Sequence, residues 1–130
     1  MSYTSQAAAY RELEVLSASP AQLVVILYDH LLVNLRKTRF ALDLTAAERR
    51  AELLGKCRDV VTELLVTLDH EKGGSIAKEL SGLYTFLLRA FLDLGTKPDA
   101  TQLERVTAIV QDLRDAFAQA SGDPRLQVAS

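Results

Sequence analysis

The sequence contains a single cysteine, Cys57, among its 130 residues. A lone cysteine forms neither an internal disulfide nor a cysteine-cluster metal site, and this usage suits a reducing compartment. We therefore expect the protein to be cytoplasmic. Because Cys57 falls on the apolar stripe of a predicted helix, it is expected to be a small core residue rather than a nucleophile.

Long apolar runs are also missing. The longest strongly apolar run, Leu23 to Tyr28, is ended by Asp29 and His30. It is far shorter than the roughly 20 residues that a helix needs to span a bilayer. The first 16 residues carry three charged side chains, where a signal peptide needs an apolar core. Neither membrane insertion nor a secretory leader is expected.

Neither sign of charge is in clear excess. Fifteen Lys and Arg residues stand against 17 Asp and Glu residues, which gives a net charge of −2. No stretch of the sequence concentrates positive charge, as a phosphate-binding surface would require. A nucleic-acid partner is therefore not expected.

Motifs of catalysis and of cofactor binding are absent as well. The sequence has no glycine-rich phosphate loop and no serine nucleophile elbow. Carboxylate-bridged metal sites in helix bundles need a Glu-x-x-His spacing, and neither His30 nor His70 has a glutamate three residues before it. The sequence therefore predicts a protein without a cofactor, a metal ion or enzymatic activity.

What the sequence does contain is apolar residues at helical spacing. Hydrophobic residues make up 48% of the chain, the β-branched pairs lie inside helical stripes, and no Asn-Gly or Asp-Gly hairpin turn occurs. These features predict a single domain, residues 1–130, with an all-α fold: an antiparallel four-helix bundle with a short N-terminal segment packed on it. The expected parts are the N-terminal segment 1–16, helices over 19–44, 46–71, 75–94 and 99–121, and a frayed tail over 122–130.

The stretch 19–44 has the clearest helix start. Ser19 can cap free backbone N–H groups, Pro20 suits the first helical position, and Gln22 completes a capping box. Leucines recur on one face, while further valine, leucine and tyrosine residues spread apolar surface around the cylinder. We expect this helix to be buried on several sides.

Caps and stops set the expected limits of the next two helices. Thr45 and Glu48 form a second capping box, which predicts a tight turn before the second helix. Gly73 and Gly74 are expected to stop that helix, because glycine readily adopts the left-handed conformation of a helix C-terminus. Ser75 is then the expected N-cap of the third helix.

Three further predictions concern the cap of the fourth helix and the faces of the second and third helices. Asp99 and Gln102 are expected to open the fourth helix. On the second helix, the polar face opposite the stripe includes Arg50. The inner positions of the third helix are expected to begin at Ile76.

His70 offers an alternative function. With Lys72 and Gly73 it resembles the active segment of histidine phosphotransfer domains, which are also four-helix bundles. In that family the histidine lies mid-helix, with lysine three and glycine four residues further on, so the spacing here is off by one. A solvated histidine at a helix end is the favoured interpretation.

Three stretches resemble a single family in their order and spacing. They are LSASPAQLVVILYDH, LDHEKGGSIAKELSGLYTFLLRAF and LRDAFAQA. From Tyr10 to Ala120 the chain resembles the FliS family, the flagellar export chaperones of flagellin. The family pattern is matched at Ala9 and Tyr10, at Ser19 and Pro20, at Leu27, Tyr28 and Asp29, at Gly73 and Gly74, and at Leu83 and Tyr84. The chain departs from it at His30, where glycine is common, at Cys57, where alanine is usual, and at Phe117, where tryptophan often lies.

The resemblance implies a non-catalytic cytoplasmic chaperone. Such a protein would bind the disordered C-terminal segment of flagellin, prevent premature polymerisation and assist delivery to the flagellar type III export apparatus. The export gate and other flagellar regulators are further expected partners. The expected partner-binding residues are Tyr10, Leu27, Tyr28, Asp29, Gly73, Gly74, Leu80, Leu83 and Tyr84.

Surplus apolar residues on the first and third helices suit this function, because a disordered client needs a long apolar surface. The segment 1–16 carries Tyr10, Leu13 and Leu16 and is expected to act as a lid on the client groove, with Tyr10 as its anchor. Two other occupants of the apolar surplus remain open: packing against this segment alone, or a second copy in a weak homodimer.

Overall fold

The computed structural model describes residues 20–122, which form an all-α bundle as predicted. It contains helices α2 (Pro20–Arg39), α3 (Ala47–Thr67), α4 (His70–Thr96) and α5 (Ala100–Ser121), and a short 3₁₀ helix, η1 (Leu44–Ala46). This part of the chain has no strand. The expected lid 1–16, the Ser19 cap and the tail beyond Gly122 lie outside the described residues.

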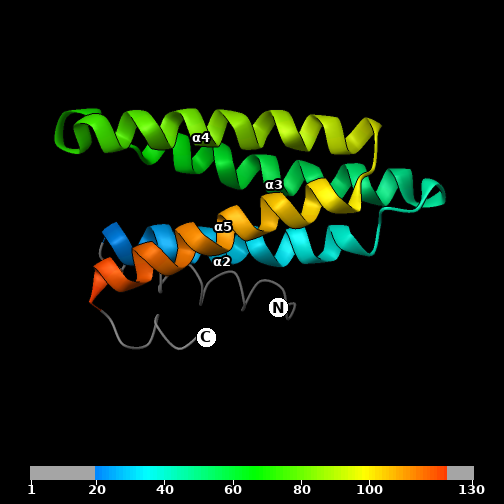
Figure 1. Cartoon of the computed structure of the whole chain (residues 1–130), viewed down its shortest axis with the longest axis horizontal. Coiled ribbons are helices and arrows are strands. Elements are labelled where there is room, and N and C mark those ends of the chain that lie inside the picture. Colours follow the sequence, from blue (N-terminus) through cyan, green and yellow to red (C-terminus); the bar gives the residue numbers. More distant parts are fainter. Residues whose placement is uncertain (1–19, 123–130) are drawn as a thin grey trace, which may run out of the picture.

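Consecutive helices run antiparallel, with α2 and α5 forming one side of the bundle and α3 and α4 the other (Figure 1). Helix α2 packs against both α3 and α5, and α3 packs against α4, whereas α4 makes limited contact with α5. Two flanking helices explain why α2 needs apolar residues around much of its circumference. Val25 and Leu32, which the main leucine stripe does not include, are both buried.

The core is one contiguous cluster to which all four helices contribute. Leu35, Leu87 and Val110 have no exposed surface, and burial of each such side chain stabilises the fold by roughly 1.5–3 kcal/mol. Cys57 is also fully buried, which confirms its predicted core position. The packing of these residues holds the four helices in fixed register.

The connection between α2 and α3 is longer than predicted. Helix α2 ends at Arg39 instead of continuing to residue 44, and η1 precedes α3. Asp43 caps η1, because its carboxylate accepts a hydrogen bond from the backbone N–H of Thr45 at 2.9 Å. The N-cap of α3 is Ala46, which makes no side-chain cap. The predicted capping box of Thr45 and Glu48 is therefore wrong.

Arg50 was expected on the polar face of its helix, but it is only 3% exposed. Its Nη1 donates to the backbone oxygens of Ala41, at 3.2 Å, and Asp43, at 3.0 Å, while Nη2 donates to that of Gly95 at 3.5 Å. The long side chain thus reaches back over its own helix and joins the α2–α3 connection to the end of α4. Backbone carbonyls accept hydrogen bonds from both Nη groups of this guanidinium, whereas its buried Nε has no hydrogen-bond partner among the described residues.

Helix α4 begins before the glycines that were expected to end the previous helix. Helix α3 already ends at Thr67. Asp69 caps α4, since its carboxylate accepts hydrogen bonds from the backbone N–H groups of Glu71, at 3.1 Å, and Lys72, at 3.0 Å. His70 is the first residue of α4.

A kink at Gly74 divides α4. This residue has φ 53° and ψ −122°, a non-helical conformation inside the helix, and glycine adopts such a positive φ without steric cost. The predicted break between helices thus occurs at Gly74, where two helical stretches meet, and Ser75 is the first residue after it within α4. Ile76 is misplaced by the sequence pattern: it is 65% exposed, and Ala77 is the buried residue of this turn.

The limits of α5 agree with the sequence pattern. The Asp99 carboxylate accepts hydrogen bonds from the backbone N–H groups of Thr101, at 2.9 Å, and Gln102, at 3.2 Å, which confirms the predicted cap. Gly122 follows the last helical residue with φ 71°, the left-handed conformation common at helix C-termini.

Candidate functional site

An open hollow of about 290 Å³ lies at the end of the bundle where α2 and α4 begin and α3 and α5 end. We call it the end hollow. All four helices contribute to it, and most of its wall is apolar. Its lining consists of Val24, Leu64, Thr67, Leu68, Asp69, Lys72, Gly73, Ile76, Ala77, Leu80, Tyr84 and Phe117. The limited contact between α4 and α5 leaves room for this opening.

Tyr84 and Phe117 line the inner wall of the end hollow, and the buried Tyr28 lies directly behind them. The hydroxyl groups of Tyr28 on α2 and Tyr84 on α4 form a buried hydrogen bond of 2.5 Å. The Tyr28 ring packs against Phe117 on α5, with ring centroids 5.6 Å apart and planes inclined by 60°, an arrangement that aromatic rings favour. Burial raises the pKa of both tyrosines above the ordinary value, so both are neutral at physiological pH. The inner wall is therefore uncharged and stiff.

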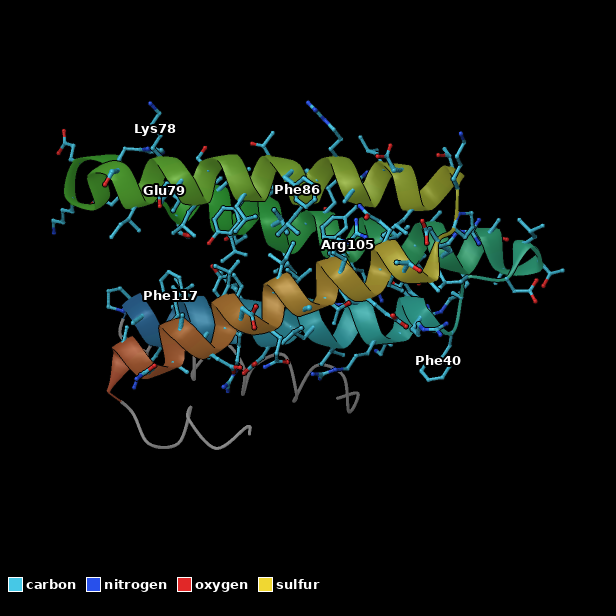
Figure 2. All side chains as sticks on the ribbon, viewed as in Figure 1. Phe40, Lys78, Glu79, Phe86, Arg105 and Phe117 are labelled. Atoms are coloured by element: carbon cyan, nitrogen blue, oxygen red, sulfur yellow. The ribbon has the colours of Figure 1, made fainter. Side chains whose placement is uncertain are left out.

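The rim of the end hollow combines apolar and charged side chains. Ile76 lies 65% exposed on α4, and Phe117 comes from the facing end of α5 (Figure 2). Asp69 and Lys72 are the charged residues of the lining, and their charges are of opposite sign. The opening thus favours an apolar occupant without selecting for a net charge.

Gly73 is needed where α4 enters the hollow. A Cβ atom at this position would lie 2.8 Å from the Cβ of Ala77, which is shorter than any normal carbon–carbon contact. The neighbouring Gly74 meets no such obstacle, and its positive φ accounts for glycine there. The two glycines are therefore needed for different reasons. Gly73 leaves room for Ala77, and Gly74 allows a positive φ.

Asp29 lies on α2 next to Tyr28 and is engaged with α5. Its Oδ1 accepts a hydrogen bond from Nε of Arg114 at 2.8 Å. The Arg114 side chain is 9% exposed and that of Asp29 is 48% exposed. The hydrogen bond with Asp29 keeps the pKa of Arg114 above its ordinary value. This ion pair lies three residues from Phe117 and helps to set the register of α5 on α2.

The structure brings together some of the expected partner-binding residues and separates others. Gly73, Leu80 and Tyr84 line the end hollow, and Tyr28 lies behind it. The remaining described members are Leu27 and Leu83, both half-buried, Asp29 in its ion pair and Gly74 at the kink. Tyr10 lies outside the described residues. Contact of these residues with a partner stays a prediction.

Sequence reasoning missed several residues of the end hollow. Phe117 was placed on the apolar stripe of the last helix and noted as a departure from the family pattern, but it was not among the expected partner-binding residues, and Ile76 was placed in the core. Val24 and Lys72 were not among the expected partner-binding residues either, although both line the opening. One signal was available: an isoleucine that directly follows a Gly-Gly-Ser sequence lies where a helix register is easily shifted.

Two side chains with reactive groups, Cys57 and His70, were singled out from the sequence, and neither is placed as catalysis would require. Cys57 is buried, and burial raises its pKa to about 12, so its thiol is neither reactive nor accessible. His70 is exposed at the first position of α4, not within a helix as in phosphotransfer domains. Among residues 20–122, no group of three or more His, Cys, Asp or Glu side chains is placed to hold a metal ion. No helix in this part of the chain has the length and apolar character needed to cross a membrane.

Comparisons with known proteins identify the family. The family model described as flagellar protein FliS matches residues 3–124. The flagellar secretion chaperone FliS of Salmonella typhimurium is 34% identical over 111 residues, which cover 85% of this chain and 82% of the relative. The corresponding chaperone of Bacillus subtilis is 30% identical over 112 residues, covering 86% and 83%, and that of Escherichia coli is 28% identical over 116 residues, covering 88% and 85%. The chain therefore belongs to the FliS family.

Proposed function

We propose that this protein is a flagellar export chaperone that binds the disordered C-terminal segment of flagellin at the end hollow. It acts in the cytoplasm, prevents premature polymerisation and assists delivery to the flagellar type III export apparatus. Membership of the FliS family supports the chaperone role. The observation that carries the choice of site is an apolar hollow to which all four helices contribute.

The physical chemistry of the end hollow suits a disordered client. A disordered segment loses conformational entropy when it binds, so it needs apolar burial in return. Ile76, Leu80 and Phe117 offer such surface around one opening. An amphipathic segment that folds into a helix on binding can place its apolar face there while its polar face stays in water.

The inner wall gives the client a surface that does not collapse in its absence. Tyr28 and Tyr84 are tied by their hydrogen bond, and the Tyr28–Phe117 contact fixes a third ring. A preorganised wall lowers the ordering cost of binding to that of the client alone. The proposed function requires no catalytic residue.

The segment 1–16 is proposed to be a lid on the end hollow, with Tyr10 as its anchor. Burial of one tyrosine contributes about 1.5–3 kcal/mol, so a tethered lid is readily displaced. A protein that begins at Ser17 should keep its helical circular dichroism and bind the flagellin segment equally or more tightly. A tenfold or greater loss of affinity would instead mean that Tyr10 touches the client.

Titration calorimetry with the C-terminal segment of the cognate flagellin tests the proposed function. We expect one-to-one binding with a clearly negative heat-capacity change, because apolar surface is buried. Ile76→Asp places a carboxylate on the apolar rim of the end hollow and should weaken binding at least about tenfold.

Val66→Asp is the matched control, because Val66 is a β-branched residue that is 76% exposed and does not line the end hollow. Binding to this variant should equal that of the unaltered protein. No binding at tens of micromolar would refute the proposed client. A homodimer at low micromolar concentration that the flagellin segment does not dissociate would favour a second copy as the occupant.

A further inference from the structure

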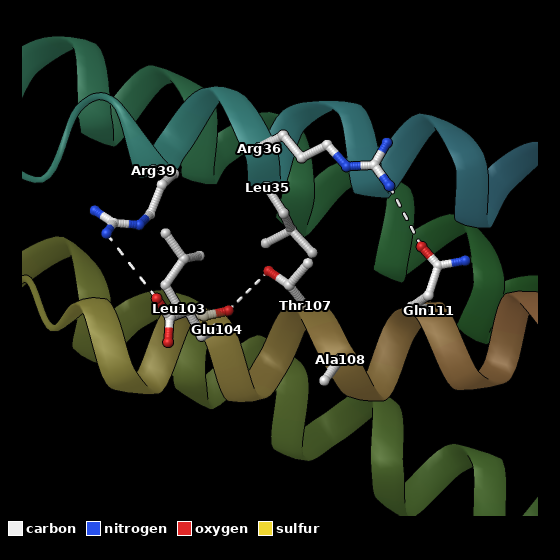
Figure 3. Close-up of a pocket in the computed structure, with 8 residues that line it drawn as sticks. All are labelled: Leu35, Arg36, Arg39, Leu103, Glu104, Thr107, Ala108 and Gln111. Atoms are coloured by element: carbon white, nitrogen blue, oxygen red, sulfur yellow. Dashed lines mark hydrogen bonds and ion pairs between the residues drawn. The ribbon is translucent and has the colours of Figure 1, made fainter. Parts of the chain in front are cut away.

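A second hollow, which we call the basic groove, lies between α2 and α5 in the half of the bundle away from the end hollow (Figure 3). Its volume is about 420 Å³, within the range of pockets that hold a ligand. Leu35 and Leu103 form an apolar floor, and the small side chain of Ala108 leaves the groove open at the surface. Its remaining lining residues are Arg36, Arg39, Glu104, Thr107 and Gln111.

The rim of the basic groove is predominantly positive. Arg36, Lys37 and Arg39 crowd the last turn of α2, and two of them line the groove, where Glu104 is the single carboxylate. Arg39 Nη2 lies 4.0 Å from Glu104 Oε1, with both side chains more than half exposed. Such a pair contributes little to stability, because water and salt screen it.

Arg36, the other arginine of the rim, is also available to pair with a partner's carboxylate. Arg36 Nη2 donates to Oε1 of Gln111, a neutral side chain, at 3.3 Å (Figure 3). A carboxylate makes a stronger hydrogen bond with a guanidinium than an amide does. A carboxylate of a partner can therefore replace Gln111 at Arg36 with a gain in free energy.

Phe40 adds an exposed aromatic ring to the same surface. It is 89% exposed and points away from the bundle (Figure 2). It directly follows Arg39, the last residue of α2, and so lies at the same end of that helix as the two arginines of the groove. Aromatic residues and arginines next to an apolar hollow are the composition of interface hot spots.

Favourable interaction with the helix dipole of α2 explains part of this pattern. Basic residues in a last helical turn interact favourably with the negative end of the helix dipole. That effect requires neither an open groove beside them nor an exposed phenylalanine. The combination points to recognition of another molecule rather than to the stability of α2 alone.

We propose that the basic groove is a second docking site, which takes an acidic amphipathic helix of a partner protein. Apolar side chains of that helix fill the space over Leu35 and Leu103, and its carboxylates pair with Arg36 and Arg39. Phe40 packs against the apolar edge of the same helix. The proposal does not depend on the identity of the client at the end hollow.

Two synthetic peptides of about 15 residues test the proposal, a length at which an isolated helix is marginal in water and can be ordered by a partner. Both carry the same stripe of leucines at helical spacing, with glutamates at the polar positions of one and lysines at those of the other. In a ¹⁵N-resolved NMR titration, the glutamate peptide should shift the amides of Arg39, Thr107 and Ala108. The lysine peptide should leave them in place.

Charge reversal at the groove should weaken the glutamate peptide specifically. The double variant Arg36→Glu, Arg39→Glu should lower its affinity about tenfold, since two attractions become repulsions. Arg89→Glu, Arg105→Glu makes the same change of net charge at exposed positions that do not line the groove, and should leave the affinity within about twofold after screening. Ala108→Phe should weaken the peptide without any change of charge.

Three results would overturn the proposal. The first is equal binding of the two peptides, and the second is equal weakening by the two double variants. The third is a set of shifts confined to the end hollow, at Leu80 and Phe117. All these substitutions are at exposed positions, and circular dichroism checks that each variant is folded.

Discussion

The hydroxyl groups of Tyr28 and Tyr84 form a hydrogen bond of 2.5 Å that joins α2 to α4 inside the core. The two residues are 0% and 1% exposed, so water does not replace either partner if the other is removed. Their connection places an uncharged wall behind the end hollow. The stability of the bundle and the shape of the site thus depend on the same pair.

A double-mutant cycle should reveal this mutual dependence. Tyr28→Phe or Tyr84→Phe alone leaves one buried hydroxyl without its partner and should lower the free energy of unfolding by about 1–3 kcal/mol. The double variant has no unpaired hydroxyl, and its loss should be well below the sum of the single losses. Urea denaturation measures all four proteins, and simple additivity would contradict the pairing.

The same pair should make stability depend on alkaline pH. Burial raises the pKa of both tyrosines above the ordinary value, which is about 10 in an unfolded chain. The folded state then holds its phenolic protons more tightly than the unfolded state. Their contribution should be complete below about pH 10 and lost as the pH rises toward the folded-state pKa. Subtracting the profile of the Tyr28→Phe, Tyr84→Phe variant, which lacks both phenols, should isolate this loss.

Replacement by alanine should have opposite effects on stability at two glycines of α4. Gly73→Ala places a Cβ 2.8 Å from that of Ala77, so it should destabilise the bundle and distort the mouth of the end hollow. Gly82 lies exposed in the same helix, and a Cβ there would meet nothing within 4 Å. Gly82→Ala should stabilise by about 0.5–1 kcal/mol, because alanine is the better helix former. Thermal melting would contradict the steric argument if both variants gained stability.

Regular apolar spacing allowed the bundle to be predicted, because burial in a bundle imposes the helical period on the sequence. The first and last residues of each helix were harder to predict. Asp69 caps α4, but Gly73 and Gly74 attracted the prediction of a stop between helices. A Gly-Gly pair is a strong local stop signal, and the sequence does not show that α4 already begins at His70, before the kink at Gly74.

Long-range contacts account for the other differences. Arg50 was assigned to the polar face, yet three backbone carbonyls from two segments bury it. Tyr28 and Tyr84 were both singled out, but no spacing rule predicts that their hydroxyl groups meet across 56 residues of sequence. Phe117 joins them only through the packing of α5 on α2. Local patterns predict elements, whereas a site built from four helix ends depends on how those elements pack.

Loss of the Asp29–Arg114 ion pair should weaken the bundle by more than an ordinary surface pair. Arg114 is nearly buried, and its Nε donates to Asp29 Oδ1 at 2.8 Å. Asp29→Asn removes the nearer of the two carboxylate charges that face this guanidinium, the other being Asp115 at 3.5 Å from Nη1, and should lower the free energy of unfolding by about 1–3 kcal/mol. Asp112→Asn on the exposed face of α5 makes the same change of charge and should be nearly silent. Because the pair lies three residues from Phe117, Asp29→Asn should also alter the environment of that ring, which NMR of a ¹³C-labelled phenylalanine sample would detect. Equal stability of the two variants would mean that the register of α5 is set by apolar packing alone.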